Sequence, residues 1–188
     1  MEWLDKTGMT VYVYIDNSNI WIEGKKIAAG LHGRDLGERY RIDFGRLLRE
    51  VSGGRVIYSA RLYGSRPPPA DSVWKAAETL GIRPTILDRN KQNKEKGVDA
   101  ELLLDAGETL SETPVHETMV LVAGDGDYVP LCERIGRRGW KAEVHFWDNA
   151  AVKLQKSAEF NDLTPKHEAI GRYARSADED LLIETYSR

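Results

Sequence analysis

The feature of this sequence that most constrains its fold is the alternation of short apolar segments with longer segments of helical pattern. The first apolar segment, VYVYID at residues 11–16, is β-branched and aromatic and carries no charge before its last residue. This composition is typical of a strand buried on both faces, as strands are in a parallel sheet. Further strands are predicted at residues 55–65, 83–88, 117–124 and 141–147.

Helices are predicted in the intervening segments. They span residues 19–33, 41–54, 71–81, 98–110, 128–139 and 149–160. Because strands that alternate with helices form βαβ crossovers, we expect an α/β fold with a mainly parallel central sheet of about five strands and helices on both faces. The charged segment 165–188 is predicted to be a C-terminal tail that is partly helical.

Composition excludes several classes of protein. A chain of 188 residues is long enough for one domain with a sizeable core. The single cysteine, Cys132, excludes an intrachain disulfide and a zinc site built from several cysteines. No apolar run approaches the ~20 residues that span a bilayer, and MEWLDKTGMT at the start lacks the features of a signal peptide, so we expect a cytoplasmic protein without a membrane partner. The net charge of −3 does not by itself indicate a nucleic-acid partner.

Aspartates follow two of the predicted strands at the point where each strand ends. Asp16 ends the first strand, and Asp125 and Asp127 come directly after the strand at 117–124. In open parallel sheets, ligands bind beyond the carboxyl ends of the strands. These three side chains are therefore expected at one edge of the sheet.

A fourth aspartate, Asp99, lies at the start of the helix predicted at 98–110. At 100° per residue it falls inside the arc formed by the apolar residues Val98, Leu102, Leu103, Ala106 and Leu110. A carboxylate on a buried face is costly unless a partner compensates its charge. Asp99 is therefore a further candidate for the same edge of the sheet.

A group of carboxylates repels itself unless some are protonated or a cation holds them. Oxygen ligands without histidine or cysteine favour Mg²⁺ or Mn²⁺, and the pattern leaves open whether one or two ions bind. Each acid also has a structural interpretation, as a helix cap, a turn residue or a first-turn acid favoured by the helix dipole. Asn19, three residues after Asp16, is a candidate for positioning water or phosphate.

Three blocks of the sequence resemble the signature blocks of the NYN family, a branch of the PIN-like nuclease superfamily that includes LabA-like bacterial proteins. The blocks are VYVYIDNSNI, KGVDAELLLDA and LVAGDGDYVPLCERIGRRGWKAEV, and the resemblance covers residues 10–164 as one domain. It implies a Rossmann-like PIN fold and Mg²⁺- or Mn²⁺-dependent ribonuclease chemistry. Asp105 matches a second acid of the middle block, and Gly126 replaces a serine common in the third.

Carried over by position, the resemblance implies the site residues. Catalytic roles fall to Asp16, Asn19, Asp99, Asp125 and Asp127, of which the four aspartates would bind the metal. The polar loop at 89–97 supplies cations for RNA phosphates, which we assign to Lys96, Lys94 and Arg89, although such a loop is often only a solvated surface. Trp21 either stacks on a base or packs in the core.

The leading hypothesis is a metal-dependent endoribonuclease that acts on RNA, with single strands favoured as substrate. The alternative is a non-catalytic module that binds RNA or protein and retains the acidic pocket. A phosphatase on a similar sheet is disfavoured, because no nucleophile loop follows the first strand. The sequence leaves open DNA as a substrate and a homodimer as the assembly.

Overall fold

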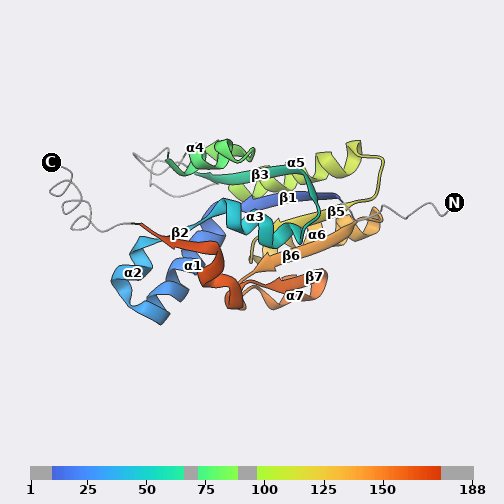
Figure 1. Ribbon diagram of the computed structural model, residues 1–188. Coiled ribbons are helices and arrows are strands. Elements are labelled where there is room, and N and C mark those ends of the chain that lie inside the picture. The colour runs from blue at the N-terminus through green and yellow to red at the C-terminus, as the bar shows by residue number, and fades with distance from the viewer. Residues whose placement is uncertain (1–9, 66–71, 89–96, 175–188) are drawn as a thin grey trace.

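A computed structural model of the chain describes residues 10–65, 72–88 and 97–174. A six-stranded sheet lies at its centre, with helices on both faces (Figure 1). The strand order is β4-β3-β1-β5-β6-β7, and every neighbouring pair is parallel. The strands are β1 (Thr10–Asp16), β3 (Val56–Ser65), β4 (Arg83–Leu87), β5 (Thr118–Val122), β6 (Lys141–Phe146) and β7 (Glu159–Asp162).

The helices lie between these strands in the chain and, for α8, after the last of them. They are α1 (Asn17–His32), α2 (Arg34–Arg39), α3 (Phe44–Ser52), α4 (Ser72–Thr79), α5 (Val98–Glu112), α6 (Val129–Arg137), α7 (Val152–Ser157) and α8 (His167–Ile170), with 3₁₀ turns η1 (Gly126–Tyr128) and η2 (Thr164–Lys166). Two short strands, β2 (Tyr40–Ile42) and β8 (Gly171–Tyr173), pair antiparallel in a separate sheet. In the part of the chain that the structure describes, no helix is long and apolar enough to cross a membrane.

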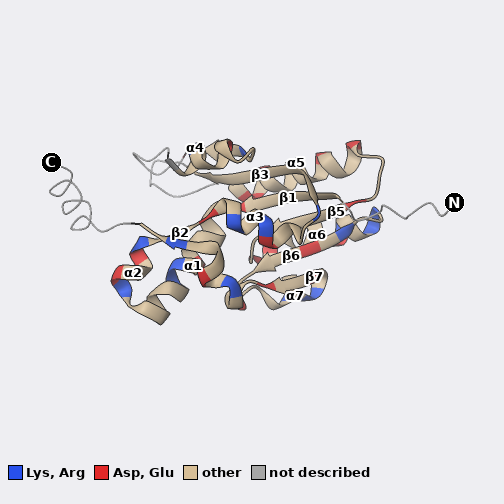
Figure 2. Cartoon of the chain, in the orientation of Figure 1, with Lys and Arg blue, Asp and Glu red and all other residues tan. Residues whose placement is uncertain are grey.

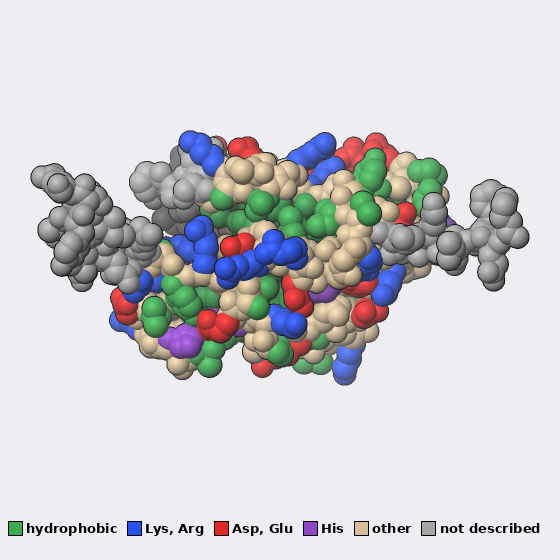
Figure 3. Space-filling model, in the orientation of Figure 1, with side chains coloured by type: hydrophobic (Ala, Val, Ile, Leu, Met, Phe, Trp, Pro, Cys, Tyr) green, Lys and Arg blue, Asp and Glu red, His purple; other side chains and the backbone are tan. Residues whose placement is uncertain are grey.

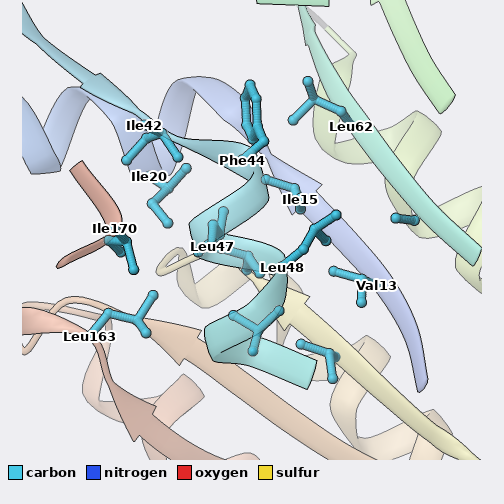
Figure 4. Close-up of a cluster of buried hydrophobic side chains, with 14 of the residues drawn as sticks. Val13, Ile15, Ile20, Ile42, Phe44, Leu47, Leu48, Leu62, Leu163 and Ile170 are labelled. Atoms are coloured by element: carbon cyan, nitrogen blue, oxygen red, sulfur yellow. The ribbon is translucent and has the colours of Figure 1, made fainter. Parts of the chain in front are cut away.

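The alternation of side chains along β1 divides the core into two halves. Val13 and Ile15 point into a cluster that α1 and α3 cover, where Ile20 and Leu47 meet them (Figure 4). Tyr14 points to the other face, where the apolar sides of α5 and α6 pack. Charged residues lie mostly on the helices and at the ends of strands (Figure 2). The strand is thus buried on both faces, and burial of one such large aliphatic side chain stabilises the fold by about 1.5–3 kcal/mol.

The α/β architecture and the parallel sheet confirm the fold expected from the sequence. The prediction of one helix over 149–160 was wrong at its end, because the chain leaves α7 at Ala158 in an extended conformation and continues as β7. β7 has only four residues, EFND, too few to show the alternation of a strand. The same holds for the three-residue strand β2, of which Arg41 and Ile42 were included in the helix predicted at 41–54.

The segment after Pro165 begins with ordered structure. α8 packs against α3, and β8 pairs with β2 through Tyr40 and Tyr173. The division of the chain at residue 165 stays a prediction, although the first residues of the predicted tail pack against the domain. The rest of the predicted tail, 175–188, and the loop cations Arg89, Lys94 and Lys96 lie outside the described residues.

Candidate acidic active site

The candidate site lies at the carboxyl ends of β1 and β5, which are neighbours in the sheet. Asp16 is the last residue of β1 and the N-cap of α1, and its Oδ1 accepts a hydrogen bond from the Asn19 backbone N–H at 3.0 Å. Asp125 follows β5 as the N-cap of η1. Because the two strands are parallel and adjacent, residues 106 apart in sequence, Asn19 and Asp125, come within hydrogen-bond distance.

Asn19 holds the loop after β5 against the start of α1. Its Nδ2 donates to Asp125 Oδ2 at 3.0 Å, and its Oδ1 accepts from the Gly124 backbone N–H at 2.6 Å. Gly124 is required there, since an added Cβ would overlap the ring of Phe146. Both polar atoms of the Asn19 side chain are therefore engaged in fixing the position of Asp125.

The hydroxyl of Tyr128 forms hydrogen bonds with two of the carboxylates. Its side chain is fully buried, and its hydroxyl lies 2.9 Å from Asp16 Oδ2 and 3.2 Å from Asp99 Oδ1. Burial, followed by the negative charges of Asp16 and Asp99, raises the pKa of Tyr128 far above its ordinary value. The hydroxyl thus stays protonated and offers its one hydrogen to the two carboxylates.

Asp99 reaches the site because of the way α5 begins. The N-cap of α5 is Gly97, whose φ of 83° lies in the left-handed region that glycine adopts without strain. The turn at Gly97 is followed at once by Val98, which is buried, and by the half-buried Asp99. The sequence prediction that Asp99 lies on the inner side of this helix agrees with its contact to Tyr128.

These residues enclose a pocket of about 240 Å³. Its lining residues are Asp16, Ser18, Asn19, Ile22, Gly97, Val98, Asp99 and Asp125. Burial, the charges of Asp99 and Asp127 and that of Glu23 raise the pKa of Asp125 above its ordinary value. The pocket therefore carries concentrated negative charge that destabilises at least one of its own carboxylates.

The structure brings Asp16, Asn19, Asp99 and Asp125 to one pocket but leaves other candidates outside. Asp127 is exposed in η1 and is not a lining residue, although its charge acts on Asp125. Asp105 instead accepts a hydrogen bond from the Tyr63 hydroxyl at 2.7 Å and pairs with Arg61 at 2.8 Å. Both partners of Asp105 belong to β3, which gives this acid a structural role.

The oxygen-only donor set of the pocket fits a hard divalent cation such as Mg²⁺ or Mn²⁺. Across residues 10–65, 72–88 and 97–174, however, no three acidic, histidine or cysteine side chains are close enough together to surround one ion. Asp16 and Asp99 point to the Tyr128 hydroxyl instead, and Asp125 points to Asn19. To hold a cation, the carboxylates would have to turn from these hydrogen bonds toward the pocket.

Two residues of the site were not predicted from the sequence. Ser18 lines the pocket beside Asn19, and the Tyr128 hydroxyl is hydrogen-bonded to Asp16 and Asp99. A signal for Tyr128 exists in hindsight, because a tyrosine buried directly after GDGD needs a hydrogen-bond partner for its hydroxyl. Trp21 is partly buried against the core, and its indole N–H donates to the Tyr40 carbonyl at 3.1 Å.

Comparisons with known proteins identify the fold and the family of the chain. A solved structure of a protein of unknown function from Vibrio parahaemolyticus has the same fold, with a TM-score of 0.62, 19% sequence identity, and coverage of 85% of this chain and 94% of that one. No curated protein matches the chain. The family model of the NYN domain matches residues 10–164, which is most of the sequence. The chain therefore belongs to the NYN domain family.

Proposed function

We propose that this protein is a metal-dependent endoribonuclease. The observation that carries the proposal is the convergence of Asp16, Asp99, Asp125 and Asn19 on one pocket at the carboxyl ends of two adjacent parallel strands. NYN domains are generally nuclease-like, which supports phosphodiester hydrolysis as the reaction class. A pocket of three carboxylates would repel the phosphates of RNA unless a cation offsets their charge.

In this proposal Asp16, Asp99 and Asp125 hold Mg²⁺ or Mn²⁺. Asp127 serves as a further ligand or orients the attacking water. A divalent cation bound there supplies a more acidic water and stabilises the charge of the phosphoryl transition state. Attack by the water oxygen on phosphorus breaks the bond to the 3′ oxygen, which takes up a proton. The products carry a 5′-phosphate and a 3′-hydroxyl.

The protein's own residues set the geometry for this chemistry. Asn19 fixes the Asp125 carboxylate through its Nδ2 and thereby acts on the site through Asp125. Tyr128 holds Asp16 and Asp99 within reach of one hydroxyl, which keeps two like charges together in the absence of a cation. We assign phosphate binding by Arg89, Lys94 and Lys96 on the sequence alone.

A second candidate function is a non-catalytic module that binds RNA or protein. One observation favours it: the carboxylates are satisfied by Tyr128 and Asn19 and do not converge on one point. In such a module the pocket would be a remnant of the nuclease site, and its acids would serve folding. The two functions differ in whether metal and the acids are needed for turnover.

The test is cleavage of a labelled single-stranded RNA in Mn²⁺, in Mg²⁺ and in EDTA. Asp125→Asn is compared with Asp148→Asn, which changes an exposed aspartate that does not line the pocket. We expect metal-dependent cleavage that Asp125→Asn abolishes and Asp148→Asn preserves. Equal cleavage by both variants, or none by the wild type on several RNAs, would overturn the nuclease and favour the binding module.

A further inference from the structure

A second pocket of about 240 Å³ adjoins the acidic one along α1. Its lining residues are Trp21, Ile22, Lys25, Lys26, Ala29, Arg34, Gly37 and Glu38. Ile22 lines both pockets and is 47% exposed, so it forms the wall between them. The two pockets are thus neighbours along α1, one lined by carboxylates and the other mainly by cations.

We propose that this second pocket, the α1–α2 pocket, binds a backbone phosphate of the nucleic-acid strand whose scissile bond lies in the acidic pocket. The proposal rests on the nuclease function, because it takes the same strand as substrate. Asn19 and Lys26 are separated by seven residues of helix, or about 10 Å at ~1.5 Å per residue. That length corresponds to about three nucleotides of a stacked strand at ~3.4 Å each.

The charges of the α1–α2 pocket suit a phosphate. Lys25 Nζ and the Arg41 guanidinium lie over the Trp21 ring, at 5.1 and 5.7 Å from its centroid. The indole N–H is held by the Tyr40 carbonyl, so the ring has a fixed orientation beneath these cations. Arg34 adds a further cation to the lining. Trp21 therefore belongs partly to the core and partly to this pocket.

The cations exceed the acids among the residues described around this pocket. Glu38 pairs with Lys25, Glu23 pairs with Lys26, and both basic and acidic residues lie along α1 and α2 (Figure 2). Lys25, and then Arg34 and Arg41, lower the pKa of Glu38, so the positive charges of several cations act on this one carboxylate. The four cations Lys25, Lys26, Arg34 and Arg41 thus exceed the two carboxylates Glu23 and Glu38 by two positive charges, which are available to bind an anion.

The surroundings of Arg41 disfavour its positive charge, and a bound anion would compensate for this. Burial, and then the charge of Arg172, lower the pKa of Arg41. Both causes disfavour its positive charge, and a phosphate beside it would offset them. On the face shown in Figure 3, Lys and Arg side chains gather over β2 and α3, with acidic side chains between them.

The proposal is tested by anisotropy of a fluorescent single-stranded RNA of about 12 nucleotides in Mg²⁺, on an Asp125→Asn parent that binds RNA without turnover. The variant is Lys25→Gln combined with Arg34→Gln, and Arg138→Ala, at the distant end of α6, is the charge control. Each phosphate contact to a single strand contributes about 0.7 to the salt slope, so loss of the one contact proposed here lowers the slope by about 0.7. If the affinities of the two proteins are equal at 1 M salt, this change of slope corresponds to about 5-fold weaker binding by the variant at ~0.1 M salt.

A second variant gives the opposite sign. Glu38→Gln removes the exposed carboxylate that competes for Lys25, and we expect it to tighten binding. Unchanged affinity in both variants, or no binding by the Asp125→Asn parent in Mg²⁺, would overturn the α1–α2 pocket as a phosphate site. Cleavage that depends on Asp125 with unaltered binding in these variants would overturn this pocket alone. Binding that depends on Lys25 and Arg34 without any cleavage would overturn the nuclease alone.

Discussion

Replacing Tyr128 by phenylalanine removes one oxygen atom, the hydroxyl that is hydrogen-bonded to two carboxylates of the acidic pocket. The hydroxyl lies 2.9 Å from Asp16 Oδ2 and 3.2 Å from Asp99 Oδ1. Asp16 is only 4% exposed, so water does not readily replace the lost donor. The substitution leaves the aromatic ring in place and therefore creates no large cavity. Its effect on stability reports the hydrogen bond to the two carboxylates.

The expected magnitude follows from the charge of the acceptors. A hydrogen bond to a charged group contributes about 1.5–3 kcal/mol, and the other oxygen of Asp16 keeps its hydrogen bond from the Asn19 backbone N–H. We therefore expect Tyr128→Phe to destabilise the metal-free protein by about 2 kcal/mol. In a chain of this size, that corresponds to a fall in Tm of about 4–8 °C.

The assay is thermal unfolding of the wild type, Tyr128→Phe and the control Tyr58→Phe, each in EDTA and in Mn²⁺. Tyr58 is 69% exposed, so its hydroxyl should contribute little. A cation bound by Asp16 and Asp99 would take over the role of the hydroxyl, so the deficit of Tyr128→Phe should narrow in Mn²⁺. A Tm within about 1 °C of the wild type in EDTA would refute the reasoning.

Three further predictions concern the acids and their partners. Asn19→Ala frees Asp125 and the Gly124 N–H, and we expect cleavage to fall by about 10–100-fold, as for other residues that orient a ligand, in a rate assay with Mn²⁺. Asp125→Asn should raise the Tm of the metal-free protein at pH 7. The pKa of Asp125 is raised in the folded protein, so its negative charge lowers the stability at pH values above the ordinary pKa of an aspartate. A lower Tm of the variant would contradict this. Burial alone would raise the pKa of Glu143, but hydrogen bonds from His145, Arg55 and Lys141 lower it well below its usual range. The stabilisation by ionised Glu143 is complete above the unfolded-state pKa of about 4.3 and is lost as the pH falls further. The difference in free energy of unfolding between wild type and Glu143→Gln, measured by urea unfolding, should therefore shrink below about pH 4.

Local pattern was sufficient to predict much of the fold. The uncharged VYVYI segment specifies a strand buried on both faces, and the apolar arc of α5 places Asp99 on its inner side. Both inferences use the periodicity of one element, which a single sequence contains. Strand ends then place Asp16 and Asp125 at one edge, because parallel neighbours end together.

Contacts between distant segments were beyond such reasoning. The contacts of Tyr128, which lies in η1, depend on where the end of β1 places Asp16 and the start of α5 places Asp99, which no local pattern encodes. The α1–α2 pocket exists because α2 folds back on α1, where a close approach of Gly37 to Ala29 leaves no room for a side chain. The strands β2 and β8 depend on each other over more than 100 residues, and each is too short to be seen alone.

The most direct test of the central claim is a crystal of the protein soaked in Mn²⁺ and measured for anomalous scattering by manganese. The account predicts a peak in the pocket between Asp16, Asp99 and Asp125, at about 2.0–2.3 Å from carboxylate oxygens that have turned from Tyr128 and Asn19. The peak should be absent in Asp16→Asn. A peak elsewhere, or none with the three carboxylates still bound to Tyr128 and Asn19, would contradict the assignment of this pocket as a metal-dependent active site.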